Sequence, residues 1–274
     1  MDHVDLPAVA PGIENLFDAV ADDYDQSGVD FFVPIARRLV QVAAASPGER
    51  ALDIGCGRGA ATVLLADAVG DDGSVTAFDL SSRMVEHTRA LVPTADVRKL
   101  DAGDPDLPEG SFDVAVASLV IFFLRDPGAA AARWLRLIAP GGRLALSTFG
   151  ALGPLWDSLD GLLRPYVPLH LRDPRLVDPE SPFRTVDRFE ALLRDAGAGE
   201  VTTAVETIRA PVKDGEQWLA FSMGTGQRMM WQHVPREERP ALFERAAGLI
   251  EAARGEDGTA ELSQEVRYSV VRPA

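Results

Sequence analysis

The chain has 274 residues, 46% of them hydrophobic and 25% charged, which excludes a disordered or fibrous protein. Because 42 acidic residues outnumber 27 basic ones, the formal net charge of −15 disfavours nucleic-acid backbones and anionic lipid surfaces as partners. A lone cysteine cannot form an internal disulfide. The first 15 residues carry acidic residues where a signal peptide has basic ones, so we expect no signal peptide, and no apolar run reaches the ~18 residues of a transmembrane helix. We expect a cytoplasmic protein without nucleic-acid or membrane partners; a homodimer is one oligomeric state left open.

Helical and strand patterns alternate along most of the chain. Amphipathic helices are expected first, over 13–25 and 31–44. The core then alternates helices and strands, with helices expected over 60–69, 83–92 and 129–138 and strands over 51–54, 75–78, 97–100, 112–117 and 143–149. The last part of the chain adds a helix over 185–196, a strand over 201–208, a helix over 237–254 and a strand over 262–271.

This alternation predicts an α/β fold, a doubly wound and mostly parallel sheet with helices on both faces. Seven strand segments are expected in all. The domain organisation that we expect is an N-terminal helical cap (1–46), a core (47–150), a cap insertion (151–184) and a C-terminal part of the core (185–274) that contains a second cap insertion at about 211–258.

Polar residues stand where four of the expected strands end, namely Asp53, Asp79, Asp101 and Ser118. In an open parallel sheet the ligand crevice lies beyond the carboxyl ends of the strands. The coincidence of polar residues and strand ends therefore predicts a ligand site at that edge.

The segment LDIGCGRG at 52–59 predicts a strand, a tight turn and the start of a helix. Gly55, Gly57 and Ala60 also fit the dinucleotide pattern G-x-G-x-x-G/A, and Asp79 lies where a ribose-binding acid is expected. Asp53, however, precedes the turn directly. Its charge repels a diphosphate and attracts an ammonium or a sulfonium group. A nicotinamide-dependent oxidoreductase stays as the alternative.

An ordered set of motifs extends this pattern from about Pro47 to Gly150: ALDIGCGRG, VTAFDLSSRMV, KLDA, FDVAVASLVIFFL and LIAPGGRLALSTF. Together they resemble the class I S-adenosylmethionine-dependent methyltransferases, whose sheet is Rossmann-like. The segment FDAVADDYD at 17–25 is similar to the start of the small-molecule branch that includes ubiquinone/menaquinone C-methyltransferase-like enzymes. The resemblance implies S-adenosylmethionine as the cofactor.

Roles for individual residues follow from their positions in these motifs. The resemblance implies that Asp53 holds the methionine amino group, that Asp79 binds the ribose hydroxyls and that Asp101 accepts from the adenine amine. The other residues implied in cofactor binding are Tyr24, Gly55, Cys56, Gly57, Gly59, Leu80, Met84, Ala102 and Ser118.

The acceptor is expected to be a small, apolar molecule, natural-product or quinone-like, that attacks the methyl group directly through O, C or N. The residues 117–120 lack the N-P-P-[YF] pattern of nucleic-acid amino-methylating enzymes, and the four histidines lack metal-ligand spacing, so no metal is expected. Candidate bases are Tyr24, Tyr166, His170 and His233. Candidate substrate-binding residues are Phe122, Phe123, Phe149, Trp156, Met230 and Trp231. A further alternative is a fold member that binds S-adenosylmethionine and catalyses another reaction, such as a cyclisation.

Overall fold

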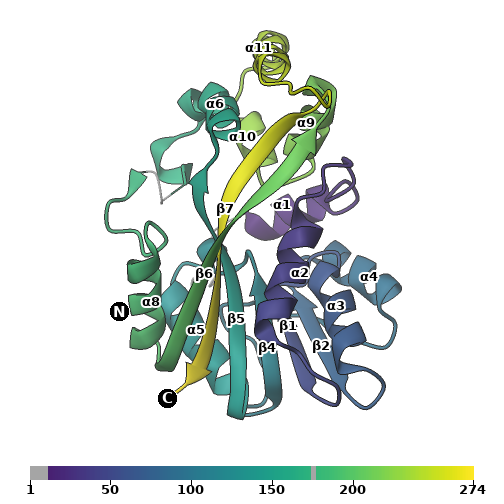
Figure 1. Ribbon diagram of the computed structural model, residues 1–274, viewed down its shortest axis with the longest axis vertical. Coiled ribbons are helices and arrows are strands. Elements are labelled where there is room, and N and C mark those ends of the chain that lie inside the picture. Colours follow the sequence, from purple (N-terminus) through teal and green to yellow (C-terminus); the bar gives the residue numbers. More distant parts are fainter. Residues whose placement is uncertain (1–11, 174–176) are drawn as a thin grey trace, which may run out of the picture.

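The computed structural model describes residues 12–173 and 177–274, and its central feature is a seven-stranded sheet (Figure 1). The strands are β1 (Arg50–Ile54), β2 (Ser74–Asp79), β3 (Asp96–Lys99), β4 (Phe112–Ser118), β5 (Ile138–Leu152), β6 (Ala198–Val212) and β7 (Ala260–Pro273). Their order is β3-β2-β1-β4-β5-β7-β6. The first five strands are parallel, and β7 runs antiparallel to β5 and β6. This confirms the doubly wound, mostly parallel sheet predicted from the sequence.

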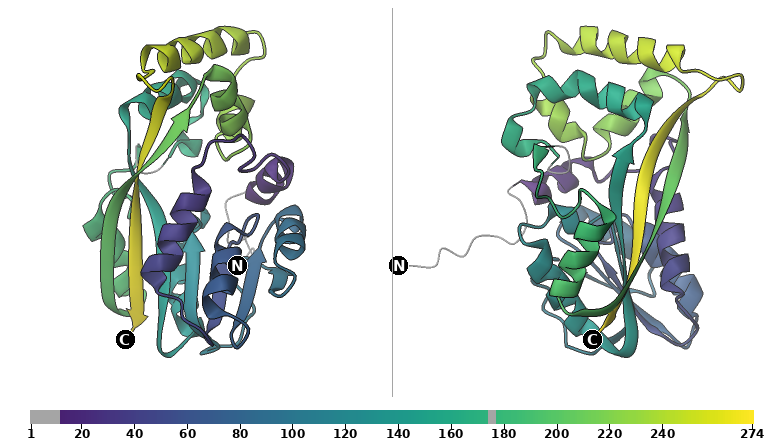
Figure 2. Two further views of the ribbon diagram at one scale, coloured as in Figure 1. Left: turned by 45° about the vertical axis from the view of Figure 1, so that its right-hand side comes forward. Right: turned by 60° about the vertical axis from the view of Figure 1, so that its left-hand side comes forward.

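Helices cover both faces of this sheet, as Figure 2 shows. Successive residues of β4 alternate between the two apolar cores: Val114 packs with the helices α2 (Phe32–Ala43) and α3 (Ala60–Val69), whereas Ala115 packs with α5 (Pro127–Leu137) and α8 (Val186–Asp195). Because β4 is buried on both faces, its sequence is a continuous apolar run. The short helix α4 (Ser82–Leu91) lies beside β2 and β3.

The remaining helices gather beyond the carboxyl ends of the parallel strands (Figure 1). One group follows β5 and consists of α6 (Pro154–Leu163), η2 (Arg164–Tyr166) and η3 (Leu169–Leu171). A second group joins β6 to β7 and consists of α9 (Gly215–Met223), α10 (Arg228–Gln232) and α11 (Arg239–Ala252). The N-terminal helix α1 (Ile13–Val20) and the 3-10 turn η1 (Ile121–Phe123) complete this layer.

Several element boundaries differ from those expected. The first helix ends at Val20 rather than at 25, and Asp25 has a φ of 59°, a left-handed conformation that a helix does not continue through. The strands expected over 201–208 and 262–271 are both longer, because they pair with each other as far as Val212 and Ala260. Pro211 is tolerated there because β6 is the edge strand of the sheet.

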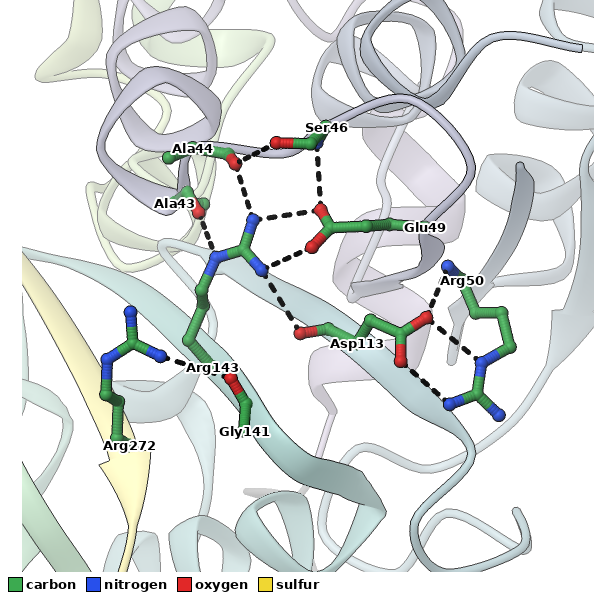
Figure 3. Close-up of polar contacts among 9 residues, drawn as sticks. All are labelled: Ala43, Ala44, Ser46, Glu49, Arg50, Asp113, Gly141, Arg143 and Arg272. Atoms are coloured by element: carbon green, nitrogen blue, oxygen red, sulfur yellow. Dashed lines mark hydrogen bonds and ion pairs between the residues drawn. The ribbon is translucent and has the colours of Figure 1, made fainter. Parts of the chain in front are cut away.

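A buried arginine fastens α2 to the amino-terminal edge of the sheet (Figure 3). The guanidinium of Arg143 on β5 donates to both carboxylate oxygens of Glu49, at 2.6 and 2.9 Å. It also donates to the backbone carbonyls of Ala43 and Ala44, where α2 ends. The hydrogen bond from Arg143 lowers the pKa of Glu49, so this carboxylate stays ionised at neutral pH.

Replacing Arg143 by Met is therefore expected to lower the free energy of unfolding by about 3 kcal/mol, because Glu49 and the Ala44 carbonyl keep only their bonds from Ser46 and the Ala43 carbonyl loses the Arg143 donor. Urea unfolding measures this loss. The matched control is Arg50→Met, which removes the ion pair with Asp113 from a side chain that is 49% exposed and costs about 1 kcal/mol or less. Equal losses in the two variants would contradict the assignment of a buried anchor.

Candidate active site

The glycine turn after β1 gives a ligand access to the backbone. Gly55, Gly57 and Gly59 have φ values of 70°, 53° and 91°, which side-chain-bearing residues rarely adopt. A Cβ at Gly55 would lie 2.5 Å from Cγ2 of Val120, whereas a Cβ at Gly57 would meet nothing within 4 Å. The turn is thus packed on one side by the segment after β4 and open beside Gly57.

Asp53, near the end of β1, is buried, and only one of its two carboxylate oxygens has a hydrogen-bond partner among the described residues. Its Oδ2 accepts a hydrogen bond of 2.6 Å from Thr62 Oγ1, and its side chain leaves Oδ1 without a hydrogen-bond partner among the described residues. Burial raises the pKa of Asp53 to about 7, against the opposing hydrogen bond from Thr62, and the nearby Asp79 adds to the rise. A buried carboxylate oxygen without a donor fits a cationic ligand group, which would return the pKa towards its ordinary value.

Asp79, at the end of β2, holds the glycine turn and the start of α4 together. Its Oδ2 accepts from the backbone N–H of Gly57 and its Oδ1 from that of Ser81, both at 2.9 Å. Each oxygen keeps further acceptor capacity, which suits a vicinal diol. Burial raises the pKa of Asp79, while the backbone donors lower it.

The third acid, Asp101, lies in the turn after β3, which ends at Lys99 rather than at residue 100 as expected. Asp101 Oδ1 accepts a 2.7 Å hydrogen bond from the N–H of Gly103, which fixes the carboxylate at the turn. The carbonyl of the buried Ala102 accepts a 2.7 Å bond from Trp134 Nε1 on α5. The turn is therefore held rigidly by a core tryptophan. Ser118 ends β4 at the point where the strand order reverses, beside β1, which is the usual ligand position in such sheets.

The helix α1 is fastened over this edge of the sheet by residues that the sequence analysis did not single out. Asp18 accepts from the Ser81 hydroxyl and from the N–H of Arg83. Arg58, inside the glycine turn, donates to the carbonyls of Ala21 and Asp22 at 2.7 Å. The acidic run 18–25 marked this region in the sequence, but no local pattern shows which of its members reach α4.

Tyr24 lies in the turn that follows α1, half-buried against Phe32 at a ring distance of 4.7 Å. Burial raises the pKa of Tyr24 well above its ordinary value, and the charges of Asp25 and Asp79 add to the rise. The hydroxyl therefore stays protonated at neutral pH and can donate a hydrogen bond. Met84 is buried beside Val20 in the same cluster. The pKa of the Cys56 thiol is likewise raised by burial, so Cys56 is neutral.

Seven aromatic side chains from α1, the turn after it, α2, η1 and β5 form a closed series, which we call the aromatic circuit. Each ring centroid lies 4.7–6.2 Å from the next around the series Phe17, Tyr24, Phe32, Phe31, Phe149, Phe122 and Phe123. All except Phe31 are partly exposed. Partly exposed aromatic rings that converge from separate elements provide an apolar surface for a ligand.

The expected substrate residues fall into two groups. The structure brings Phe122, Phe123 and Phe149 together in the circuit, and Trp156 packs against Phe31 at 5.0 Å. Trp231 is buried in the helical group between β6 and β7, where its ring is 5.9 Å from that of Trp218 and its Nε1 donates to Ser222. Met230 on the same helix is half-buried. The sequence did not point to four further aromatic residues of this cluster, namely Phe17, Phe31, Phe32 and Phe221.

The candidate bases are dispersed. The side chain of His170 on η3 lies outside the described residues. His233 follows α10 and its N–H donates to the carbonyl of Met230. Tyr166 donates to the carboxylate of Glu238, which raises the pKa of this tyrosine. Within 12–173 and 177–274, no group of three or more His, Cys, Asp or Glu residues is arranged to hold a metal ion.

Comparison with known proteins decides between the readings of the glycine turn. A family model described as a methyltransferase domain matches residues 52–146. Nocamycin O-methyltransferase of Saccharothrix syringae is 35% identical over 250 residues, which cover 83% of this chain and 86% of that protein. The chain is a class I S-adenosylmethionine-dependent methyltransferase. The aklanonic acid methyltransferase DauC of a Streptomyces species is 34% identical over 189 residues, which cover 67% of this chain and 86% of the relative.

Among solved structures, the cyclase SpnF superposes on this methyltransferase with a TM-score of 0.55 at 17% identity, covering 100% of both chains. At that identity the likeness shows the fold alone. The reaction therefore follows from the sequence relatives, which are methyltransferases of small molecules in secondary metabolism, and this enzyme transfers a methyl group from S-adenosylmethionine to a small molecule. Among the described residues, the helices lack the combination of length and apolar character that crossing a bilayer requires.

The site fits this cofactor on two observations of the structure itself, namely the unpartnered Asp53 Oδ1 and the open backbone at Gly57. S-adenosylmethionine supplies a methyl group on a sulfonium, which is already activated for transfer. The protein contributes positioning and exclusion of water, which can account for much of the rate. The negative charge of Asp53 and Asp79 at the strand ends favours the cationic cofactor.

Proposed function

We propose that this methyltransferase methylates an oxygen atom of a flat, polycyclic and largely apolar acceptor. The observation that carries the proposal is the aromatic circuit, which is built from α1, the turn after it, α2, η1 and β5. Aromatic rings stack on other rings in offset or edge-to-face arrangements, which gain free energy beyond area burial. A flat acceptor matches such a surface better than an aliphatic or strongly charged one.

Oxygen is supported as the methylated atom by the chemistry of the surrounding residues. Tyr24 stays protonated, and Asp53 is buried and bonded to Thr62 of α3, so neither is arranged as a strong base. A carboxylic acid or an acidic phenol loses its proton near neutral pH without such a base. The names of the two relatives, an O-methyltransferase and an aklanonic acid methyltransferase, agree with this choice.

We propose the following division of roles among the residues. Asp53 binds the methionine ammonium, and Asp79 and Asp101 bind the ribose and the adenine amine. The other cofactor contacts come from Tyr24, Gly55, Cys56, Gly57, Gly59, Leu80, Met84, Ala102 and Ser118. The aromatic circuit holds the acceptor so that its oxygen meets the methyl group and water is excluded.

A panel of acceptors tests the proposal. Polycyclic aromatic carboxylic acids and phenols are expected to yield methylated products, whereas histamine and glycine are expected to yield none. In the variant Phe149→Leu, the KM for an active polycyclic acceptor is expected to rise on the order of 10-fold at an unchanged KM for S-adenosylmethionine, because one face of the circuit is lost. The control is Phe243→Leu on α11, where the ring lies beside Gly215 at the start of α9. Turnover of only the small polar amines would overturn the proposal.

Two further properties belong to the same proposal. The enzyme acts in the cytoplasm on a free acceptor without a nucleic-acid partner, as the net charge of −15 favours. A homodimer is proposed as its oligomeric state, and light scattering after size-exclusion chromatography measures the mass directly.

A further inference from the structure

The helices beyond the carboxyl ends of the strands contain a polar pair to which the roles proposed above assign nothing. Gln227, at the start of α10, donates from Nε2 to Oδ1 of Asp160 on α6 at 2.6 Å. This bond joins the two cap segments, one that follows β5 and one that joins β6 to β7. Figure 1 shows α6 and α10 as neighbours above the sheet.

The pair adjoins the circuit through its neighbours along the chain. Asp160 lies one helical turn after Trp156, so both side chains project from the same face of α6. Trp156 in turn contacts Phe31 at a ring distance of 5.0 Å and Phe221 of α9 at 5.7 Å.

The turn that carries Gln227 also contacts α1 and the segment that follows it. Arg228, next to Gln227, donates to the carbonyl of Ala19 at 3.3 Å, and a Cβ at Gly224 would lie 2.9 Å from the carbonyl oxygen of Asp23. The turn between α9 and α10 is therefore packed on the segment that carries Tyr24. The neighbours of Gln227 along the chain thus contact the Tyr24 segment, while its own amide bonds to α6, the helix that carries Trp156.

The orientation of the Gln227 amide is fixed by chemistry. A carboxylate can only accept hydrogen bonds, so the amide must turn Nε2 towards Asp160 and Oε1 away from it. Oε1 is buried and has no hydrogen-bond partner among the described residues. A buried acceptor without a donor is costly unless a ligand supplies the donor.

We infer that Gln227 is a specificity-determining residue, whose Oε1 accepts a hydrogen bond from a hydroxyl group of the acceptor, and that Asp160 is the positioning residue that orients it. The inference rests on the proposed function and narrows it: the polycyclic acceptor carries a hydroxyl group on the side that faces the cap. A site that hydrogen-bonds a hydroxyl discriminates against the analogue that lacks it.

The test compares two probes that differ only in hydroxyl groups, 2,6-dihydroxyanthraquinone and anthraquinone. Their binding to the protein saturated with S-adenosylhomocysteine is followed by quenching of tryptophan fluorescence. The wild type is expected to prefer the dihydroxy compound on the order of 10-fold, and Gln227→Met is expected to reduce this preference to about 2-fold without changing the affinity for anthraquinone. A merely structural role would weaken both probes alike.

Two variants complete the design. Gln217→Met on α9 is the matched control, because both ends of that amide are satisfied by the backbone, and it is expected to keep the full preference. In Asp160→Asn the new amide can donate to Oε1 and let Gln227 turn over, so the preference is expected to fall about 3-fold or more.

The possible results distinguish a failure of the role of Gln227 from a failure of the proposed function. If both probes bind and the wild type and Gln227→Met show the same preference, or the wild type shows none, the inference about Gln227 is overturned and the proposed function stands. If the protein binds S-adenosylhomocysteine and neither probe, the flat acceptor and the role of Gln227 both fail.

Discussion

Replacing Asp79 by Ala is expected to weaken the binding of S-adenosylhomocysteine by at least about 100-fold, as measured by calorimetric titration. The change removes the acceptors that we propose for the ribose hydroxyls and also the acceptors for Gly57 N–H and Ser81 N–H. Hydrogen bonds to a charged group contribute about 1.5–3 kcal/mol each, so the loss of two such bonds suffices for this factor. The glycine turn and α4 lose their common anchor at the same time.

Two controls make this result specific. Asp79→Asn keeps one carboxamide oxygen and is expected to show an intermediate affinity. Asp96→Ala removes an exposed acid of β3 whose partner is Arg98, and it is expected to leave the affinity unchanged. Wild-type affinity in Asp79→Ala would show that the cofactor lies elsewhere. Tight binding of NADH by the wild type would revive the oxidoreductase reading.

The affinity for S-adenosylhomocysteine is expected to rise with pH through the pKa of Asp53, which burial raises to about 7. Below that pH the carboxyl is neutral and cannot pair with the ligand ammonium. The affinity therefore gains up to about 10-fold per pH unit below the pKa and levels off above it. Asp53→Asn is expected to bind weakly and without this pH dependence. Titrations in buffers with different ionisation enthalpies measure the proton that wild-type Asp53 releases on binding.

The stability of the free protein is expected to change with pH in the opposite direction to the affinity. Between the ordinary value of 3.8 and about 7, the folded state keeps a proton on Asp53 that the unfolded state has lost. The free energy of unfolding contributed by this group therefore falls as the pH rises through that window. The decrease in Tm as the pH rises from about 5 to about 7 is expected to be smaller in Asp53→Asn than in the wild type. Identical curves for the two proteins would contradict a protonated buried Asp53.

The cofactor edge of the sheet could be predicted from the sequence because its signals are local. The segment 52–59 contains its strand, its turn and its helix start within a few residues, Asp79 ends a recognisable strand, and Asp101 follows β3 by two residues. Parallel strands bring such ends to one edge of the sheet without any further information. For this reason the fold was predicted correctly in its strand number and its direction of winding.

The acceptor side could not be predicted to the same extent, because its members come from segments far apart in the sequence. Phe17 contacts Phe123, and Phe31 contacts both Phe149 and Phe221. Each of these residues alone has the pattern of an ordinary core position. The full length of β6 and β7 was missed for a related reason, since each strand is extended by pairing with the other.

The most direct test of the account is the mass balance of one reaction. The enzyme is incubated with S-adenosylmethionine carrying a trideuterated methyl group and with a polycyclic aromatic acid or phenol, and the mixture is analysed by mass spectrometry. We expect an acceptor with one trideuteromethyl group on oxygen and an equal amount of S-adenosylhomocysteine. A consumed acceptor of unchanged mass, with no S-adenosylhomocysteine formed, would show that the protein catalyses a different reaction and would contradict methyl transfer.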